Sequence, residues 1–137
     1  MILLDTHIWL WWLLGDGALN SKQREELDRL ASERQLAISW VSLWETEMLE
    51  AKGRIRLLPG FESWLKKATD RAICRVLPVD LEVVLAQRRL PATFHYDPAD
   101  RLITATALLA ECPLATFDDK IKKSEVAEIW EWKSSSD

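Results

Sequence analysis

Short apolar segments that alternate with helical patterns restrict the possible folds of this chain more than any other feature. The segments span residues 1–4, 36–39, 73–77 and 114–116, and a last edge strand is expected at 128–132. Apolar runs of this length are typical of strands buried on both faces of a parallel sheet. We therefore expect an α/β fold: a three-layer sandwich with a central, mainly parallel sheet and helices on both faces.

Helical patterns fill the intervals between these segments. Helices are expected at 6–14, from 21, at 42–52, at 61–68, from the cap Asp80 to 88, and from Asp97 onward. Gly15 and Gly17 are expected to end the first helix, and Gly53 the third.

Length and charge restrict the number of domains and the kind of surface that the protein can present to a partner. The 137 residues are enough for one domain, expected at 1–132, with a frayed tail at 133–137. The formal net charge of −4 argues against a broad basic surface for nucleic acid, although bound divalent cations would add charge that this count omits. Cys74 and Cys112 have no zinc-site spacing and are expected to be small buried residues.

The apolar run at 8–14 is too short to span a bilayer. It has seven residues, and no lysine or arginine precedes Lys22, so it also lacks the basic start of a signal peptide. The sequence predicts a cytoplasmic protein that does not associate with a membrane.

Four acidic residues occupy comparable positions beside the predicted strands. Asp5 directly follows the first strand, and Asp118 follows the strand at 114–116. Glu45 and Asp100 lie in the first turns of two helices. Because ligand sites in open α/β sheets gather at the carboxyl ends of the strands, this fold can bring all four together.

Each acid also has a structural interpretation as a helix cap. Ser42 and Glu45 fit a capping box, and Asp97 with Asp100 fits an N-cap followed by an acid favoured by the helix dipole. Asp118 or Asp119 could cap the last helix. Asp5 could cap the first helix, but its apolar surroundings make an uncompensated carboxylate there costly.

If the four acids converge, the repulsion between their charges decides between the cap interpretation and a metal site. Two carboxylates ~6 Å apart repel by about 3 kcal/mol at an effective dielectric of 20. Four acids form six such pairs, whereas a cap contributes only ~1 kcal/mol. Protonation or a bound cation would have to offset the repulsion, and oxygen ligands favour Mg²⁺ or Mn²⁺.

Five motifs occur in an order that is familiar from one family. They are Met1-Ile-Leu-Leu-Asp-Thr-His7, Ser39-Trp-Val-Ser-Leu-Trp-Glu45, Lys52-Gly-Arg-Ile-Arg-Leu57, His95-Tyr-Asp-Pro-Ala-Asp-Arg101 and Thr116-Phe-Asp118. Over nearly its whole length the chain resembles the PIN-domain family, and within it the VapC-type toxins of toxin–antitoxin pairs. The resemblance implies a Rossmann-like sandwich, Mg²⁺- or Mn²⁺-dependent cleavage of RNA, and inhibition by a small cognate antitoxin.

The resemblance also assigns roles to individual residues. The family's acids carry over onto Asp5, Glu45, Asp100 and Asp118, with Asp119 as an alternative for the last. Asp5 and Asp100 are expected to bind the metal directly, and Glu45 and Asp118 through water. Candidates for substrate contacts are Arg101, Thr6, Thr116 and His95, with Lys52, Arg54 and Arg56 as further basic residues.

The sequence leaves several functions open besides that of a toxin. A phosphotransfer fold also places aspartates at strand ends, but His7 stands where an aspartyl-phosphate phosphatase needs a second acid. The chain could also be a housekeeping RNA-processing nuclease, or a non-catalytic binding module in which the acids are only caps. A homodimer is expected, and Trp40 and Trp44 share a helical face that could bind an antitoxin or a second subunit.

Overall fold

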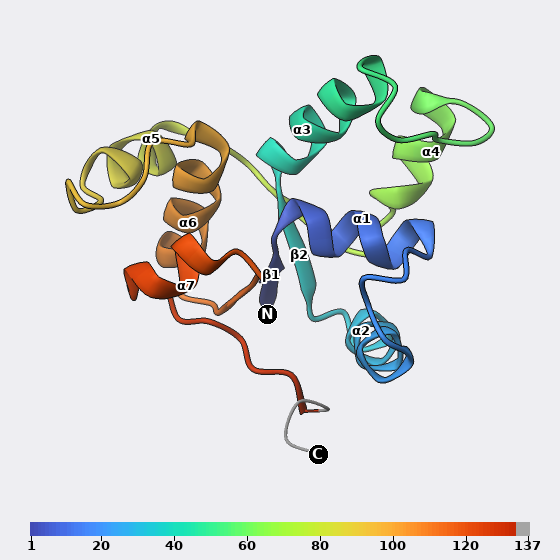
Figure 1. Cartoon of the computed structure of the whole chain (residues 1–137), viewed down its shortest axis with the longest axis horizontal. Coiled ribbons are helices and arrows are strands. Elements are labelled where there is room, and N and C mark those ends of the chain that lie inside the picture. The colour runs from blue at the N-terminus through green and yellow to red at the C-terminus, as the bar shows by residue number, and fades with distance from the viewer. Residues whose placement is uncertain (134–137) are drawn as a thin grey trace.

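The computed structural model describes residues 1–133, which form a four-stranded parallel sheet surrounded by helices (Figure 1). The strands are β1 (Ile2–Leu4), β2 (Leu36–Ser39), β3 (Arg75–Leu77) and β4 (Leu114–Ala115), in the order β3-β2-β1-β4. The helices are α1 (Thr6–Leu14), α2 (Ser21–Ser32), α3 (Trp40–Ala51), α4 (Phe61–Ala68), α5 (Leu81–Arg88), α6 (Pro98–Ala110) and α7 (Asp119–Ser124). All three strand pairs are parallel, as the apolar runs predict.

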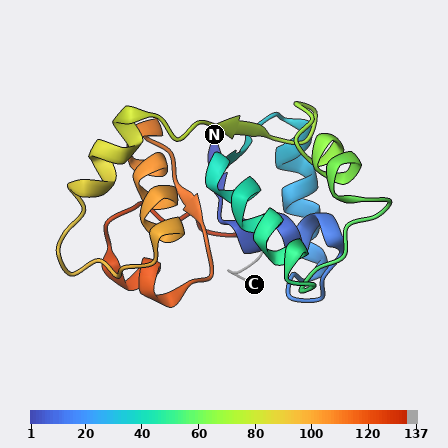
Figure 2. The same ribbon diagram turned by 90° about the horizontal axis from the view of Figure 1, so that it is seen from above.

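Successive residues of the central strands point into two separate cores. Leu4 and Ile38 belong to a core with residues of α1, α2 and α4. Leu3 and Ala37, one residue earlier on each strand, belong to a second core with residues of α6 and α7. Side chains alternate across a sheet, so a strand covered on both sides is apolar throughout. The three-layer sandwich is therefore confirmed, and Figure 2 shows the two groups of helices on opposite sides of the sheet.

Helix α3 begins one turn earlier than the sequence suggests. Ser39 is its N-cap, and the Ser39 hydroxyl accepts a hydrogen bond from the Val41 amide at 3.0 Å. The structural interpretation of Ser42 and Glu45 as a capping box is therefore wrong. Because Ser42 lies inside the helix, its side chain and that of Glu45 are available for contacts with α1.

The predicted edge strand at 128–132 forms only an isolated parallel bridge between Leu114 and Ile129. The Leu114 amide donates to the Glu128 carbonyl at 2.8 Å, and the Trp130 amide donates to the Leu114 carbonyl at 2.9 Å. Strand β4 has two residues, so a partner finds little to pair with. The prediction of a full strand here is wrong.

The structure also bears on the expectations for the cysteines, for a membrane span and for the C-terminal tail. Cys74 and Cys112 are both buried free thiols. No helix within residues 1–133 is long and apolar enough to cross a membrane. Of the predicted tail, the Lys133 amide donates to the Glu26 carboxylate at 3.1 Å, and the rest lies outside the described residues.

Candidate active site

The carboxyl ends of β1, β2 and β4 meet at one edge of the sheet, where the predicted acids gather around a cavity of about 360 Å³. The residues that line it are Asp5, His7, Ile8, Trp11, Glu45, Asp97, Asp100, Phe117 and Asp118. All four predicted acids are therefore in one place, although they come from four different parts of the chain. Asp119 is exposed and does not line the cavity, so the structure favours Asp118 over its neighbour.

Asp5 is the most deeply buried of these acids, with 7% of its surface exposed. Its Oδ1 accepts a hydrogen bond from the Thr6 amide at 2.8 Å and thereby caps α1. Its Oδ2 accepts a hydrogen bond from the Thr116 hydroxyl at 2.7 Å. The capping interpretation and the site interpretation of Asp5 are thus compatible, because both oxygens are held while the group lines the cavity.

Glu45 is held by the first residue of α1. The Thr6 hydroxyl donates to Glu45 Oε1, and the Thr6 oxygen lies 2.8 Å from Ser42 Oγ. The single hydroxyl proton of Thr6 goes to the carboxylate, so Ser42 acts as the donor to Thr6. The two predicted substrate contacts Thr6 and Thr116 therefore both have their hydroxyls bonded to cavity carboxylates.

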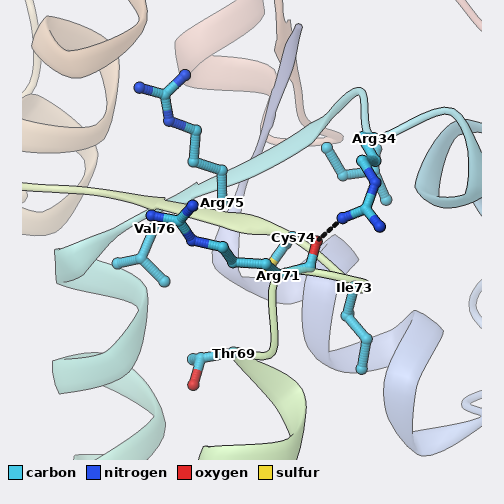
Figure 3. Close-up of a pocket in the computed structure, with 8 residues that line it drawn as sticks. Arg34, Thr69, Arg71, Ile73, Cys74, Arg75 and Val76 are labelled. Atoms are coloured by element: carbon cyan, nitrogen blue, oxygen red, sulfur yellow. Dashed lines mark hydrogen bonds between the residues drawn. The ribbon is translucent and has the colours of Figure 1, made fainter.

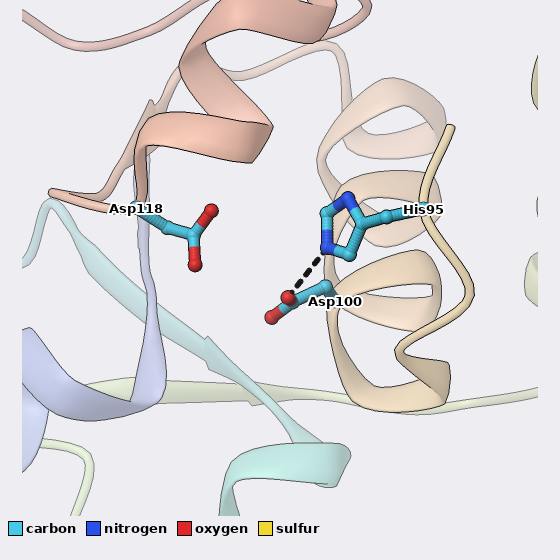
Figure 4. A group of neighbouring side chains, drawn as sticks. All are labelled: His95, Asp100 and Asp118. Carbon is cyan, nitrogen blue, oxygen red and sulfur yellow. Dashed lines mark hydrogen bonds and ion pairs between the residues drawn. The ribbon is translucent and has the colours of Figure 1, made fainter. Parts of the chain in front are cut away.

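Asp100 and Asp118 also line the cavity, and His95 lies beside them (Figure 4). One potential ligand atom from each residue lies within 4.8 Å of those of the other two. His95 Nε2 is 2.7 Å from Asp100 Oδ2. Asp118 also caps α7, because its Oδ1 accepts a hydrogen bond from the Ile121 amide at 3.0 Å. Three side chains from the α6 and α7 segments can therefore reach a common point.

Burial and mutual repulsion make these carboxyl groups hard to ionise. Burial raises the pKa of Asp5, Glu45 and Asp100 above their usual values, and the charges of neighbouring carboxylates raise each pKa further. One side-chain hydrogen bond to each acid works in the other direction. The donors are Thr116 for Asp5, Thr6 for Glu45 and His95 for Asp100.

Arg101, the basic residue next to Asp100, is engaged elsewhere. Its Nε donates to Gln87 Oε1 at 2.8 Å, and its Nη1 lies 3.3 Å from the carbonyls of both Phe94 and His95. It does not line the acidic cavity. These contacts do not support the predicted substrate role of Arg101, and they show instead that it fastens the segment carrying His95 onto α5 and α6.

Sequence reasoning missed the aromatic residues at this site. Trp11 and Phe117 line the cavity, and so does His7. A spacing signal existed, because Ile8 and Trp11 are three residues apart and so are neighbours on the surface of α1, which begins directly after Asp5. The apolar character of the whole helix concealed that signal, since it favours no single face.

Two other cavities differ in chemistry from the acidic one. The larger of the two, about 610 Å³, lies at the amino ends of β2 and β3, and its lining includes three arginines, Arg34, Arg71 and Arg75, and no carboxylate (Figure 3). A small one of about 110 Å³ shares Glu45 and His7 with the acidic cavity and adds Lys52 and Arg54. The acidic cavity alone among these three combines carboxylates from several elements.

The fold and this site define a Rossmann-like α/β protein with a carboxylate-lined cavity at its strand ends. Residues 2–126 match the PIN domain model, and the chain belongs to the PIN domain family. Ribonuclease VapC22 of Mycobacterium tuberculosis (strain ATCC 25618 / H37Rv) is 31% identical over 121 residues, which cover 88% of this chain and 89% of that protein. The resemblance seen in the sequence motifs is thereby confirmed.

Solved structures support the same fold. A chain in the crystal structure of DNA-bound VapBC from Salmonella typhimurium matches with a TM-score of 0.73 and 18% identity, over 96% of this chain and 97% of that chain. A chain of VapBC2 from Rickettsia felis, bound to a DNA fragment from the VapBC2 promoter, matches with a TM-score of 0.71 and 19% identity, over 97% and 100%. At these identities the likeness concerns the architecture.

Proposed function

We propose that this protein is a metal-dependent endoribonuclease that hydrolyses RNA phosphodiester bonds and acts as the toxin of a toxin–antitoxin pair. The observation that carries the proposal is the convergence of Asp5, Glu45, Asp100 and Asp118 on one cavity. The relative at 31% identity is named a ribonuclease, which supports the reaction class. Residues 1–132 would form the single nuclease domain.

The donor set of the cavity fits a hard divalent cation. Asp5 is buried and Asp100 is half-buried, burial raises the pKa of both carboxyl groups, and both line the cavity. A buried cluster of this kind is stabilised when a cation supplies the missing positive charge. Asp5 and Asp100 would hold Mg²⁺ or Mn²⁺ directly, because carboxylate oxygens are the preferred ligands of both ions. Bound there, the ion would supply Lewis-acid stabilisation of the phosphate and lower the pKa of a water.

The side chains of this protein have separate tasks in that reaction. Glu45 and Asp118 would orient water, since each keeps one carboxylate oxygen without a hydrogen bond within residues 1–133. His95 would fix the orientation of Asp100 through their 2.7 Å contact. The hydroxyls of Thr6 and Thr116 hold the carboxylates of Glu45 and Asp5 in place. The site is thus held by donors that come from three different segments.

Positive charge for the RNA backbone is available beside the acidic cavity. Lys52 and Arg54 line the small adjoining cavity and take part in no ion pair within residues 1–133. Gly53 between them adopts a φ of 70°, a left-handed conformation that favours glycine and ends α3 at this turn. The pair would bind a phosphate next to the one that is cleaved.

The protein partners are proposed to be a small cognate antitoxin and a second copy of the chain. The structural neighbours include VapBC complexes, which supports an antitoxin partner. Large apolar side chains are exposed on several helices, among them Trp40 and Trp44 on α3 and Leu81 and Val84 on α5. Exposed apolar groups of this kind are common at subunit interfaces. The predicted site of action is the cytoplasm.

RNA cleavage by the purified protein tests the proposal. Mixed RNA should be cut when Mg²⁺ or Mn²⁺ is added and left intact after chelation with EDTA, and Asp5→Asn should be inactive although folded. Expression of the protein alone should arrest growth, and a small neighbouring gene should reverse the arrest. Cleavage without growth arrest would indicate a housekeeping nuclease, and absence of cleavage would refute the proposal.

A further inference from the structure

The acidic cavity is lined in part by three neighbouring ring side chains, His7, Trp11 and Phe117, which we call the aromatic wall. The His7 and Trp11 ring centroids are 5.7 Å apart, and those of Trp11 and Phe117 are 6.1 Å apart with an interplanar angle of 24°. Trp11 and Phe117 are half-buried and His7 is exposed. The rings therefore form a continuous surface that reaches solvent within the cavity.

A second layer of rings holds this wall in place. Phe117 stacks on Trp132 with centroids 5.7 Å apart and an interplanar angle of 14°, and Trp132 in turn contacts Trp130 edge-on at 4.8 Å. Lys122 Nζ lies 5.4 Å from the Phe117 centroid. A wall supported from behind keeps its shape, so a ligand that binds to it finds a preformed surface.

Trp11 and Phe117 pack against the edge of one core, but core packing does not account for the part of each ring that lines the cavity. Trp9, on the same helix, is fully buried and shows what a core tryptophan looks like in this protein. Trp11, two residues later, instead lines a cavity together with Asp5 and Asp118. Carboxylates that hold a cation, with aromatic rings beside them, suit a ligand that has both a phosphate and a flat apolar part.

We propose that the aromatic wall is a nucleobase subsite, which takes an unstacked base next to the phosphate that is cleaved. This inference rests on the proposed ribonuclease function and adds a binding contact to it. A base is uncharged, so the carboxylates do not repel it, and every base has a face that stacks on an aromatic ring. A cavity of about 360 Å³ is within the range, roughly 300–1,000 Å³, in which small organic ligands bind.

An abasic RNA substrate separates this role from a structural one. A short single-stranded RNA with one cleavage site is prepared intact and with an abasic nucleotide at each position flanking that site. The wild type in Mg²⁺ should lose about 5- to 150-fold in kcat/KM at one abasic position, as expected for ~1–3 kcal/mol per stacked base. Trp11→Leu and Phe117→Leu should show a loss of that size on intact RNA and no further loss on the abasic RNA.

Matched variants control for damage to the fold. Trp12→Leu removes the same side chain from the neighbouring position of α1, where Trp12 donates to Asp28 outside the cavity, and should cleave both RNAs like the wild type. Trp11→Phe, which keeps a ring, should retain the difference between intact and abasic RNA.

Three results would overturn the subsite. The wild type could cleave every abasic substrate with the same kcat/KM as intact RNA. Alternatively, Trp11→Leu could show the same fold loss in kcat/KM on intact RNA and on abasic RNA. The wall variants could also cleave normally while escaping inhibition by an antitoxin, which would assign the wall to a protein partner. Failure of the wild type to cleave any RNA would overturn the ribonuclease function itself, so the two failures are distinguishable.

Discussion

The hydroxyl of Thr116 donates a 2.7 Å hydrogen bond to the carboxylate of Asp5, although the two residues are 111 positions apart in the sequence. Their strands are neighbours in the sheet, and the register pairs Leu4 with Ala115. The next residue of each strand is therefore Asp5 and Thr116, and the Asp5 amide donates to the Ala115 carbonyl at 2.9 Å. Parallel pairing of β1 with β4 thus fixes the orientation of the most buried acid.

Thr116→Val should reduce cleavage about 10- to 100-fold without unfolding the protein, since loss of such a supporting hydrogen bond typically has this effect at metal sites. The Thr116 hydrogen bond lowers the pKa of Asp5, so its removal should shift the acid limb of the kcat/KM–pH profile to higher pH. Thr116→Ser keeps the hydroxyl and should restore both rate and profile. An unchanged profile in Thr116→Val would argue against this role.

The burial of Asp5 predicts how stability depends on pH. Because burial raises the pKa of Asp5 from its ordinary 3.8, the folded state binds this proton more tightly than the unfolded chain does. The bound proton stabilises the folded state fully at pH values below the unfolded pKa of 3.8. This stabilisation is lost as the pH rises through the raised pKa of the folded state. Without divalent cations, Asp5→Asn should therefore be more stable than the wild type at pH 7.5 and lose this advantage towards pH 4.

Urea unfolding at several pH values measures this difference between the two proteins. Asparagine also caps helices well, so the substitution preserves the N-terminus of α1. Mg²⁺ at 100 times the dissociation constant of the wild type should stabilise the wild type by about 2.7 kcal/mol at pH 7.5 and stabilise Asp5→Asn by less. An Asp5→Asn protein that is the less stable one at every pH would show that the carboxylate is compensated without a cation.

The contacts of Arg101 predict a structural effect, whereas those of Lys52 predict a binding effect. Arg101→Met should lower the free energy of unfolding by roughly 1.5–3 kcal/mol, because charged hydrogen bonds to Gln87 and Phe94 are lost. Its KM for RNA should stay the same.

Lys52→Met should raise KM and reduce the salt dependence of binding by about one unit of slope, with unchanged stability. A higher KM in Arg101→Met together with a lower stability in Lys52→Met would contradict the assignment.

Adjacent aspartates provide a test of which one belongs to the site. Asp118→Asn should reduce cleavage at least 100-fold, because its side chain lines the cavity near Asp100. Asp119→Asn should leave the rate within twofold of the wild type. Equal rates in both variants, measured on the same RNA, would remove Asp118 from the reaction.

The positions of the strands and of the four acids could be predicted because they depend on local patterns. Apolar runs determine which segments enter the sheet, and residues such as Asp5 that follow them gather at one edge. The Thr6 and Thr116 contacts could not be foreseen, since they depend on the register between strands and on the orientation of α3. The same holds for Ser39, because Ser39 and Ser42 are equally good caps in sequence.

The substrate role predicted for Arg101 relies on its position next to Asp100 in the sequence, and its contacts do not support that role. Arg101 follows Asp100 directly, but consecutive residues on a helix point about 100° apart, so one faces the cavity while the other faces α5. The aromatic wall was missed for a related reason. Its members Trp11 and Phe117 come from opposite ends of the chain, and only the folded structure places their rings together.

Calorimetric titration of Mn²⁺ at pH 7.5 tests the central claim most directly, namely that the converging carboxylates form one cation site. The wild type should bind Mn²⁺ at a specific site, Asp119→Asn should bind it with the same affinity, and Asp5→Asn and Asp100→Asn should lose at least tenfold. Absence of saturable binding by the wild type, or equal affinity in all four proteins, would contradict the account.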